Sequence, residues 1–268
     1  MSDLEMINLK DGAELRLTDR DIKDILEKVN IFQCMTTVQI AKVNEMHIKV
    51  CQRRLRKLLK EDYLRKVLIP TTKGRSPYLL YLGSKGEALL NTRSSKPRLT
   101  LQLTHQQKNT DILIDIINSF KSTGIKCGVL PEHLIRIAEQ EIIPDGTFML
   151  ERNNKSILLL IENCSGTEII KSPSFNQDIE TKIIRYEEMF VDNNVRYYED
   201  YFKRNLRRFR LLYLTNDTSR QSSISSLIKD HDIHGFVYIS TLSEFKQKGI
   251  TANIWNIPAV NKFNQSII

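Results

Sequence analysis

The sequence predicts an α+β protein of two domains, and three observations support that prediction. The chain has 268 residues, more than the roughly 100–150 residues of a usual single domain. Residues 1–90 show short helical patterns followed by a hairpin, whereas residues 101–268 alternate between helices and apolar strands. Between them, NTRSSKPRLT at 91–100 is rich in serine and charge, which is typical of a linker.

Three short helices are expected in the first domain. Thr18 precedes DRDIKDILEKV and can cap a helix whose apolar residues recur at helical spacing from Ile22. Thr36 and Gln39 form an S/T-x-x-Q capping box, which indicates that a second helix starts there. The stretch HIKVCQRRLRKLLKED, residues 47–62, predicts the third helix.

The third helix has an apolar back and a cationic front. Its apolar side is formed by Ile48, Cys51, Leu55, Leu58 and Leu59. Its opposite side carries Lys49, Arg53, Arg56, Lys57 and Lys60, with Gln52 and Arg54 flanking them. Such a helix suits the recognition position of a helix-turn-helix, where Arg, Lys and Gln reach phosphates and base edges of double-stranded DNA.

A hairpin with a basic tip follows the third helix. Residues 64–69 and 78–82 are predicted to form two strands that flank the turn PTTKGRSP, and this turn carries Lys73 and Arg75. The stretch SKGEALL then predicts a short closing helix. The order helix, helix, helix, hairpin, helix is typical of a winged helix whose tip contacts DNA, and a structural or protein-binding winged helix is the alternative.

The charge is concentrated in the first part of the chain. Residues 1–98 hold 20 Lys and Arg against 12 Asp and Glu, whereas residues 99–268 hold 20 of each. A basic block on a folded segment indicates a polyanionic partner. The four cysteines form no CxxC pair, and no apolar run reaches the ~18 residues of a membrane span. With no signal peptide at its start, the sequence favours a cytoplasmic protein with reduced thiols that does not contact a membrane.

A second hairpin opens the possibility of a metal site. After a helix over residues 103–120, the apolar runs TFMLER and SILLLIEN predict two strands joined at Asn153 and Asn154. A turn centred there places Asp145 opposite Glu162, on the same face of the sheet. Two such carboxylates could share a divalent cation, as an enzyme that cleaves phosphodiesters requires.

The remaining elements complete a small α/β domain. One long helix or two are expected before the strand FRLLYLT, followed by a helix over SRQSSISSLIKDH and a final strand GFVYIS. This order suits the restriction-endonuclease-like core, which is a central mixed sheet with flanking helices. The tyrosines and arginines of VRYYEDYFKRNLRRF indicate either core packing or a second nucleic-acid surface. His231-x-x-His234 is better explained by a loop than by a metal site.

The chain resembles the replication-relaxation family of plasmid, phage and integrative-element proteins. The resemblance rests on LTDRDIKDILEKVNIFQCMTTVQIAKV, CQRRLRKLLKEDYLRK, GRSPYLLYLGSKGEALL, PDGTFML, LLLIENCSGTE, KIIRYEEMF and FRLLYLT. It spans Leu17 to about Thr215. It implies a winged helix that binds DNA, joined to a nuclease-like domain of the PD-(D/E)xK type.

One position departs from the pattern of active nucleases. Cys164 stands two residues after Glu162, where active nucleases have an ionisable residue such as lysine and members of the family often have an acidic one. Lys182 on the following helix could supply the cation, and Lys171 is a weaker candidate. Further carboxylates could come from Asp111 or Asp115 on the first helix of this domain. The alternative is a degenerate site in which the carboxylates are structural.

Two functions therefore stay open. The first is a DNA-binding protein of a mobile element that controls replication, maintenance or transcription without a cofactor, and a homodimer is left open. The second is a divalent-metal-dependent nuclease or nickase with Asp145 and Glu162 as ligands of Mg²⁺ or Mn²⁺ and Lys182 near the phosphate. A third hypothesis is an adaptor whose basic helix binds an acidic protein.

Overall fold

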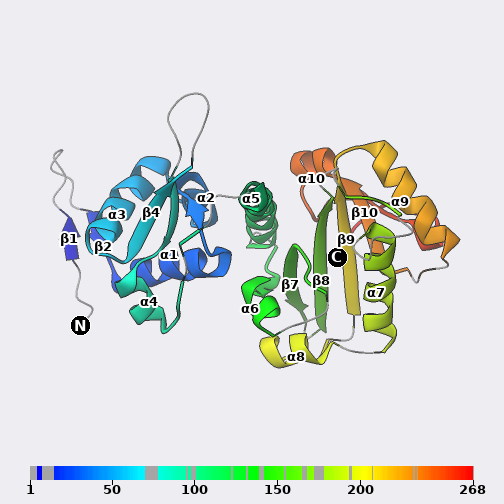
Figure 1. The fold of residues 1–268 in the computed structure, drawn as a ribbon, viewed down its shortest axis with the longest axis horizontal. Helices are drawn as coiled ribbons and strands as arrows, with labels where there is room; N and C mark the ends of the chain where they lie inside the picture. The colour runs from blue at the N-terminus through cyan, green and yellow to red at the C-terminus, as the bar shows by residue number, and fades with distance from the viewer. Residues whose placement is uncertain are drawn as a thin grey trace. The chain divides into compact units, whose positions relative to one another are not determined.

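The structure is a computed structural model with mixed α and β architecture (Figure 1). It describes residues 5–7, 15–69, 78–94, 96–97, 101–121, 123–130, 132–138, 142–153, 155–164, 168–171, 178–192, 195–206, 208–231, 233 and 235–267. The chain divides into two compact units, residues 1–114 and 115–268. The division falls inside helix α5 (Leu101–Lys121). Leu103 of α5 packs with Cys34 and Leu79, which ties the start of this helix to the first unit.

The first unit contains the helices and the hairpin that the sequence predicts. Its elements are β1 (Glu5–Ile7), β2 (Leu15–Leu17), α1 (Asp19–Phe32), β3 (Met35–Thr36), α2 (Thr37–Val43), α3 (Ile48–Lys60), β4 (Leu64–Leu68), β5 (Tyr78–Leu82) and α4 (Ser84–Leu90). Both predicted caps are present, because Thr18 and Thr36 each accept a hydrogen bond from the backbone N–H three residues later. The short strand β3, which the sequence did not suggest, pairs with β5 and extends the hairpin.

The second unit is built on a mixed sheet. Within the described residues this sheet has seven strands in the order β12-β11-β10-β9-β8-β7-β6. The strands are β6 (Lys126–Leu130), β7 (Gly146–Arg152), β8 (Lys155–Cys164), β9 (Arg208–Thr215), β10 (Val237–Thr241), β11 (Trp255–Ile257) and β12 (Lys262–Gln265). Strands β8, β9 and β10 run parallel, whereas the strands on either side of them pair antiparallel.

The register of the β7–β8 hairpin is the one that the sequence predicts. Gly146 pairs with Ile161, and Arg152 pairs with Lys155 at the turn. Asn153 adopts a left-handed conformation with φ of 50°, which asparagine tolerates better than most residues. The strand pairing therefore continues directly towards Asp145 and Glu162.

Helices cover both faces of the sheet. They are α6 (Glu132–Ile137), α7 (Ile179–Val191), α8 (Arg196–Phe202), α9 (Thr218–Asp230) and α10 (Leu242–Lys248). Figure 1 shows α7 and α9 on one side of β9 and α10 on the other. The main core lies under α7 and α9, where Leu158 and Leu160 of β8 meet Ile183 and Tyr186 of α7. Apolar burial on this face is the largest stabilising contribution to the unit.

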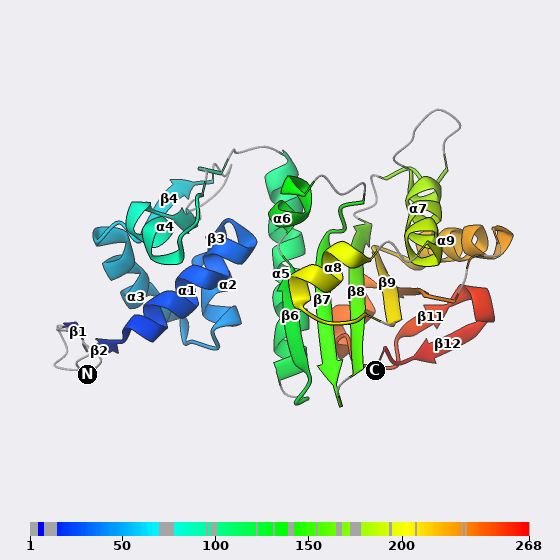
Figure 2. The ribbon, with the colours of Figure 1, turned by 90° about the horizontal axis from the view of Figure 1, so that it is seen from below.

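The sequence prediction missed α10, β11, a 3-10 helix at Pro258–Val260 and β12 at the C-terminal end. Strand β10 is not the final strand, because α10 follows it and so does the β11–β12 hairpin, which Figure 2 shows. Trp255 of β11 is fully buried and donates a hydrogen bond from Nε1 to the carbonyl oxygen of Ile250 at 2.8 Å. The expected helical stretch before β9 is two helices, α7 and α8. No helix among the described residues is long and apolar enough to cross a membrane.

Candidate functional site

Helix α3 presents polar and cationic side chains to solvent from a buried apolar back. Its inward face consists of Cys51, Leu55 and Leu58, all at most 3% exposed. The exposed positions recur at helical spacing and are Lys49, Gln52, Arg56 and Lys60. Arg53 is half-buried beside them. No aspartate or glutamate lies within α3, so the exposed stripe is a positively charged surface.

Two of the predicted DNA-binding residues are engaged inside the first unit. Arg54 donates from Nη1 to Oδ1 of Asp21 on α1 at 3.0 Å, and its side chain is only 18% exposed. Burial raises the pKa of Asp21, but hydrogen bonds from Thr18 and the Arg54 guanidinium outweigh burial and lower it. Lys57 Nζ lies 3.8 Å from Oε1 of Glu61. These side chains stabilise the unit, and the tip residues Lys73 and Arg75 lie outside the described residues.

In the second unit, the carboxylates of the β7–β8 hairpin meet at its open end. Glu162 lies on β8 and is 1% exposed. Asp145 directly precedes β7, and its Oδ2 accepts a hydrogen bond from the backbone N–H of Asn163 at 2.8 Å. The structure therefore places Asp145 beside Glu162, as the predicted register required.

Helix α7 supplies two donors to Glu162. Lys182 Nζ lies 2.7 Å from Oε2, and the hydroxyl of Tyr186 donates to Oε1 at 2.6 Å. Lys182 and Tyr186 are four residues apart and thus share one face of the helix. Asp178 caps α7 by accepting from the N–H of Thr181 at 2.8 Å, which fixes the start of this helix. Lys182 Nζ also lies 3.8 Å from Oε1 of Glu168.

The electrostatics of this cluster follow from its burial. Burial raises the pKa of Glu162 to about 7, Asp145 acts in the same direction, and Lys182 and Tyr186 oppose the shift. For Lys182, burial disfavours the charge, but the Glu162 carboxylate outweighs burial and raises the lysine pKa. The lysine therefore stays charged at neutral pH, whereas Glu162 is near its titration midpoint.

Cys164 lies on the same face of β8 as Glu162 and is 1% exposed. Burial raises the pKa of its thiol, and the neighbouring Glu168 and Glu162 carboxylates raise it further. A neutral thiol is a poor ligand for Mg²⁺ and cannot replace a cation. Lys182, from a different element, is the cation that contacts Glu162.

Other predicted residues lie elsewhere or have other partners. Lys171 pairs with Glu180 at 2.8 Å, and His231 contacts the same carboxylate. Asp111 accepts a hydrogen bond from Gln39 Nε2 at 2.9 Å within the first unit. Asp115 lies on α5, and His234 is outside the described residues.

The sequence analysis missed two tyrosine hydroxyl groups beside the Glu162 carboxylate. The first is that of Tyr186, whose spacing of four from Lys182 was a usable signal. The second belongs to Tyr213 on β9, which pairs with Glu162 in the sheet. The Tyr213 hydroxyl is buried and has no hydrogen-bond partner among the described residues.

These features define a mixed α/β protein with a cationic helical unit and a second unit that holds a buried carboxylate–lysine pair. The replication-relaxation family model matches residues 26–198, which is more than half of the chain. The chain belongs to the replication-relaxation family, and this membership associates it with the replication of mobile elements. Searches of curated proteins and of solved structures each find no match.

Proposed function

We propose that the chain is a DNA-binding protein of a plasmid, phage or integrative element, acting on its replication, maintenance or transcription. In this proposal, α1 to α4 with the β4–β5 hairpin form a winged helix, and α3 is the recognition helix that contacts double-stranded DNA. The second unit, of restriction-endonuclease-like topology, serves homodimer or partner contact. Membership in a family associated with replication supports a DNA partner.

The exposed stripe on α3 is the observation that supports the proposal most strongly. Lys49, Arg56 and Lys60 project from a helix whose other face is closed by core packing. Cations on a fixed scaffold displace the counterions of DNA, which makes binding dependent on salt. Gln52 lies in the same stripe and can form hydrogen bonds with base edges.

Binding to fragments of the element's own origin or promoter, measured by fluorescence anisotropy over a range of salt concentrations, tests the proposal. The triple change Lys49→Gln, Arg56→Gln and Lys60→Gln should weaken binding and reduce the salt slope by about 3, near 0.9 per phosphate contact. Lys23→Gln on α1, whose side chain is 59% exposed, is the matched control. Equal affinity of the triple variant and the control would contradict the assignment of α3.

A second candidate is a divalent-metal-dependent nuclease of the PD-(D/E)xK type. One observation favours it, because Lys182 brings to Glu162 the cation that position 164 lacks. A Mg²⁺ or Mn²⁺ ion would be held by Asp145 and Glu162. Both oxygens of Glu162 already accept hydrogen bonds, and no group of three His, Cys, Asp or Glu suited to a metal occurs among the described residues. This donor set does not fit the ion, so we favour binding over cleavage.

Nicking of supercoiled plasmid in Mg²⁺ or in Mn²⁺ distinguishes the two candidates. We expect no nicking by the unaltered chain above the level of an Asp145→Asn variant. Metal-dependent nicking that is lost in both Asp145→Asn and Lys182→Met would establish the nuclease. Contaminating nucleases are excluded by purifying the variants in parallel and by requiring the same loss in each.

A further inference from the structure

A pocket of about 450 Å³ opens at the amino-terminal ends of β9 and β10. It lies away from the Glu162 cluster, because Glu162 pairs with Tyr213, five residues beyond the start of β9. Its volume is within the range of about 300–1,000 Å³ that is usual for small-molecule sites. Neither the DNA contact proposed for α3 nor the carboxylate cluster uses these residues.

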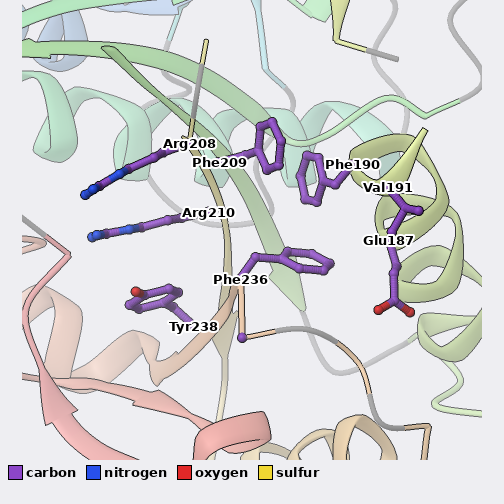
Figure 3. Close-up of a pocket in the computed structure, with 9 residues that line it drawn as sticks. Glu187, Phe190, Val191, Arg208, Phe209, Arg210, Phe236 and Tyr238 are labelled. Carbon is purple, nitrogen blue, oxygen red and sulfur yellow. The ribbon is translucent and has the colours of Figure 1, made fainter. Parts of the chain in front are cut away.

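One side of the pocket is cationic. Figure 3 shows Arg208, Arg210 and Tyr238 extending side by side in the same direction. The Arg210 guanidinium lies over the Tyr238 ring, 5.0 Å from its centroid. The two arginines are two residues apart on β9 and so point to the same face of the sheet.

Within the part of the chain that the structure describes, no carboxylate pairs with the positive charge on this side. Nη1 of Arg210 is buried and has no hydrogen-bond partner among the described residues. Burial lowers the pKa of Arg210 and the charge of Arg208 lowers it further, whereas Tyr238 opposes these effects. A half-buried guanidinium with a second one beside it favours an anion with several acceptor oxygens.

The other side of the pocket, which lies on the opposite face of β9, is aromatic (Figure 3). Phe190 of α7 stacks on Phe209 with ring centroids 4.1 Å apart, and Phe236 meets Phe190 edge-on at 4.6 Å. Phe209 and Phe236 are half-buried and line the pocket. Glu187 lies on this side, away from the guanidinium groups (Figure 3). An anion bound at the arginines is therefore separated from the Glu187 carboxylate.

We propose that this pocket binds a nucleotide, with its phosphate at Arg208 and Arg210 and its base against Phe209 and Phe236. A phosphate supplies the acceptor oxygens that Arg210 lacks, and a base supplies the flat apolar surface that suits the aromatic side. The nucleotide is either free or the 5′-phosphorylated end of a DNA strand. Both sources have the same chemistry at the pocket.

Isothermal titration calorimetry of the full chain with dAMP, deoxyadenosine and inorganic phosphate tests the proposal. We expect dAMP to bind at least tenfold more tightly than either deoxyadenosine or inorganic phosphate. Arg208→Gln should weaken the binding of dAMP about tenfold, as the loss of one charge-assisted hydrogen bond does. Arg196→Gln, at a side chain that is 89% exposed on α8, should have no effect.

Three results would overturn the proposal: no binding of dAMP, equal affinity for phosphate and dAMP, or full affinity in Arg208→Gln. Arg208 is exposed, so its substitution should leave the fold intact, and a thermal unfolding curve checks this. A 5′-phosphorylated oligonucleotide then identifies the source, measured in a Lys49→Gln, Arg56→Gln, Lys60→Gln background. Tighter binding than dAMP that depends on Arg208 assigns a strand end, and binding no tighter than dAMP assigns a free nucleotide.

Discussion

Lys182 Nζ lies 2.7 Å from Glu162 Oε2, so a cation from helix α7 neutralises a carboxylate that β8 buries almost completely. The two residues are twenty positions apart and come from different elements. Tyr186, one helical turn after Lys182, binds the other oxygen. A buried charge that has lost its hydration requires such partners, and here a single helix face supplies both.

Removing the cation should destabilise the second unit. We expect Lys182→Met to lower the free energy of unfolding by about 1–3 kcal/mol, less than for a fully buried pair because the lysine side chain is 31% exposed. The cost should be larger at pH 8 than at pH 5, since protonation of Glu162 relieves the unpaired charge. Urea denaturation measures it. Lys171→Met, at a side chain that is 70% exposed, should change the stability little, and an equal loss there would refute this argument.

The raised pKa of Glu162 makes a separate prediction about pH. A carboxyl whose pKa is about 7 when folded and 4.5 when unfolded stabilises the fold fully below 4.5. That contribution is lost as the pH rises through 7. The free energy of unfolding relative to Glu162→Gln should therefore fall from pH 4.5 to 7, by up to roughly 3 kcal/mol at about 1.4 kcal/mol per pKa unit. Parallel pH profiles for the two proteins would contradict the buried placement of Glu162.

Local patterns in the sequence predicted the carboxylate pair well. The hairpin register depends on alternation and on one turn, and Asn153 marks that turn by its tolerance of positive φ. The position of Asp145 against Glu162 follows from that register. Lys182 was predictable as a substitute cation because its helix follows β8 directly along the chain.

Tertiary contacts were less predictable. The exposed and buried cations of α3 have the same residue types, and only packing distinguishes Arg56 from Arg54, which turns to Asp21. The β11–β12 hairpin was missed because its strands are only three and four residues long. A pocket of about 450 Å³ joins Phe190 of α7 to Arg208 and Phe236 at two strand ends, and no sequence spacing records that proximity.

Gly86 of α4 packs directly on the backbone of Tyr63, in the turn after α3, and should therefore tolerate no side chain. A Cβ atom there would lie 2.3 Å from the carbonyl oxygen of Tyr63, a backbone atom that cannot move aside freely. We expect Gly86→Ala to destabilise the first unit by about 1–3 kcal/mol, as overpacking does. Circular dichroism melting curves give the loss. Gly235→Ala is the comparison, because its Cβ would lie 3.4 Å from Val260 Cγ1, and a similar loss in both variants would contradict the close approach at Gly86.

Neighbouring arginines of α3 should separate stability from DNA binding. Arg54 pairs with Asp21, so Arg54→Gln should cost about 1 kcal/mol of stability, because one partly buried ion pair is lost. Arg56 is exposed, so Arg56→Gln should leave the unfolding curve unchanged while weakening DNA binding several-fold and reducing the salt slope by about 0.9. Both changes remove one positive charge from the same helix. A protein that senses only net charge would therefore lose equal affinity in each variant, and that result would argue against a defined DNA-contacting face.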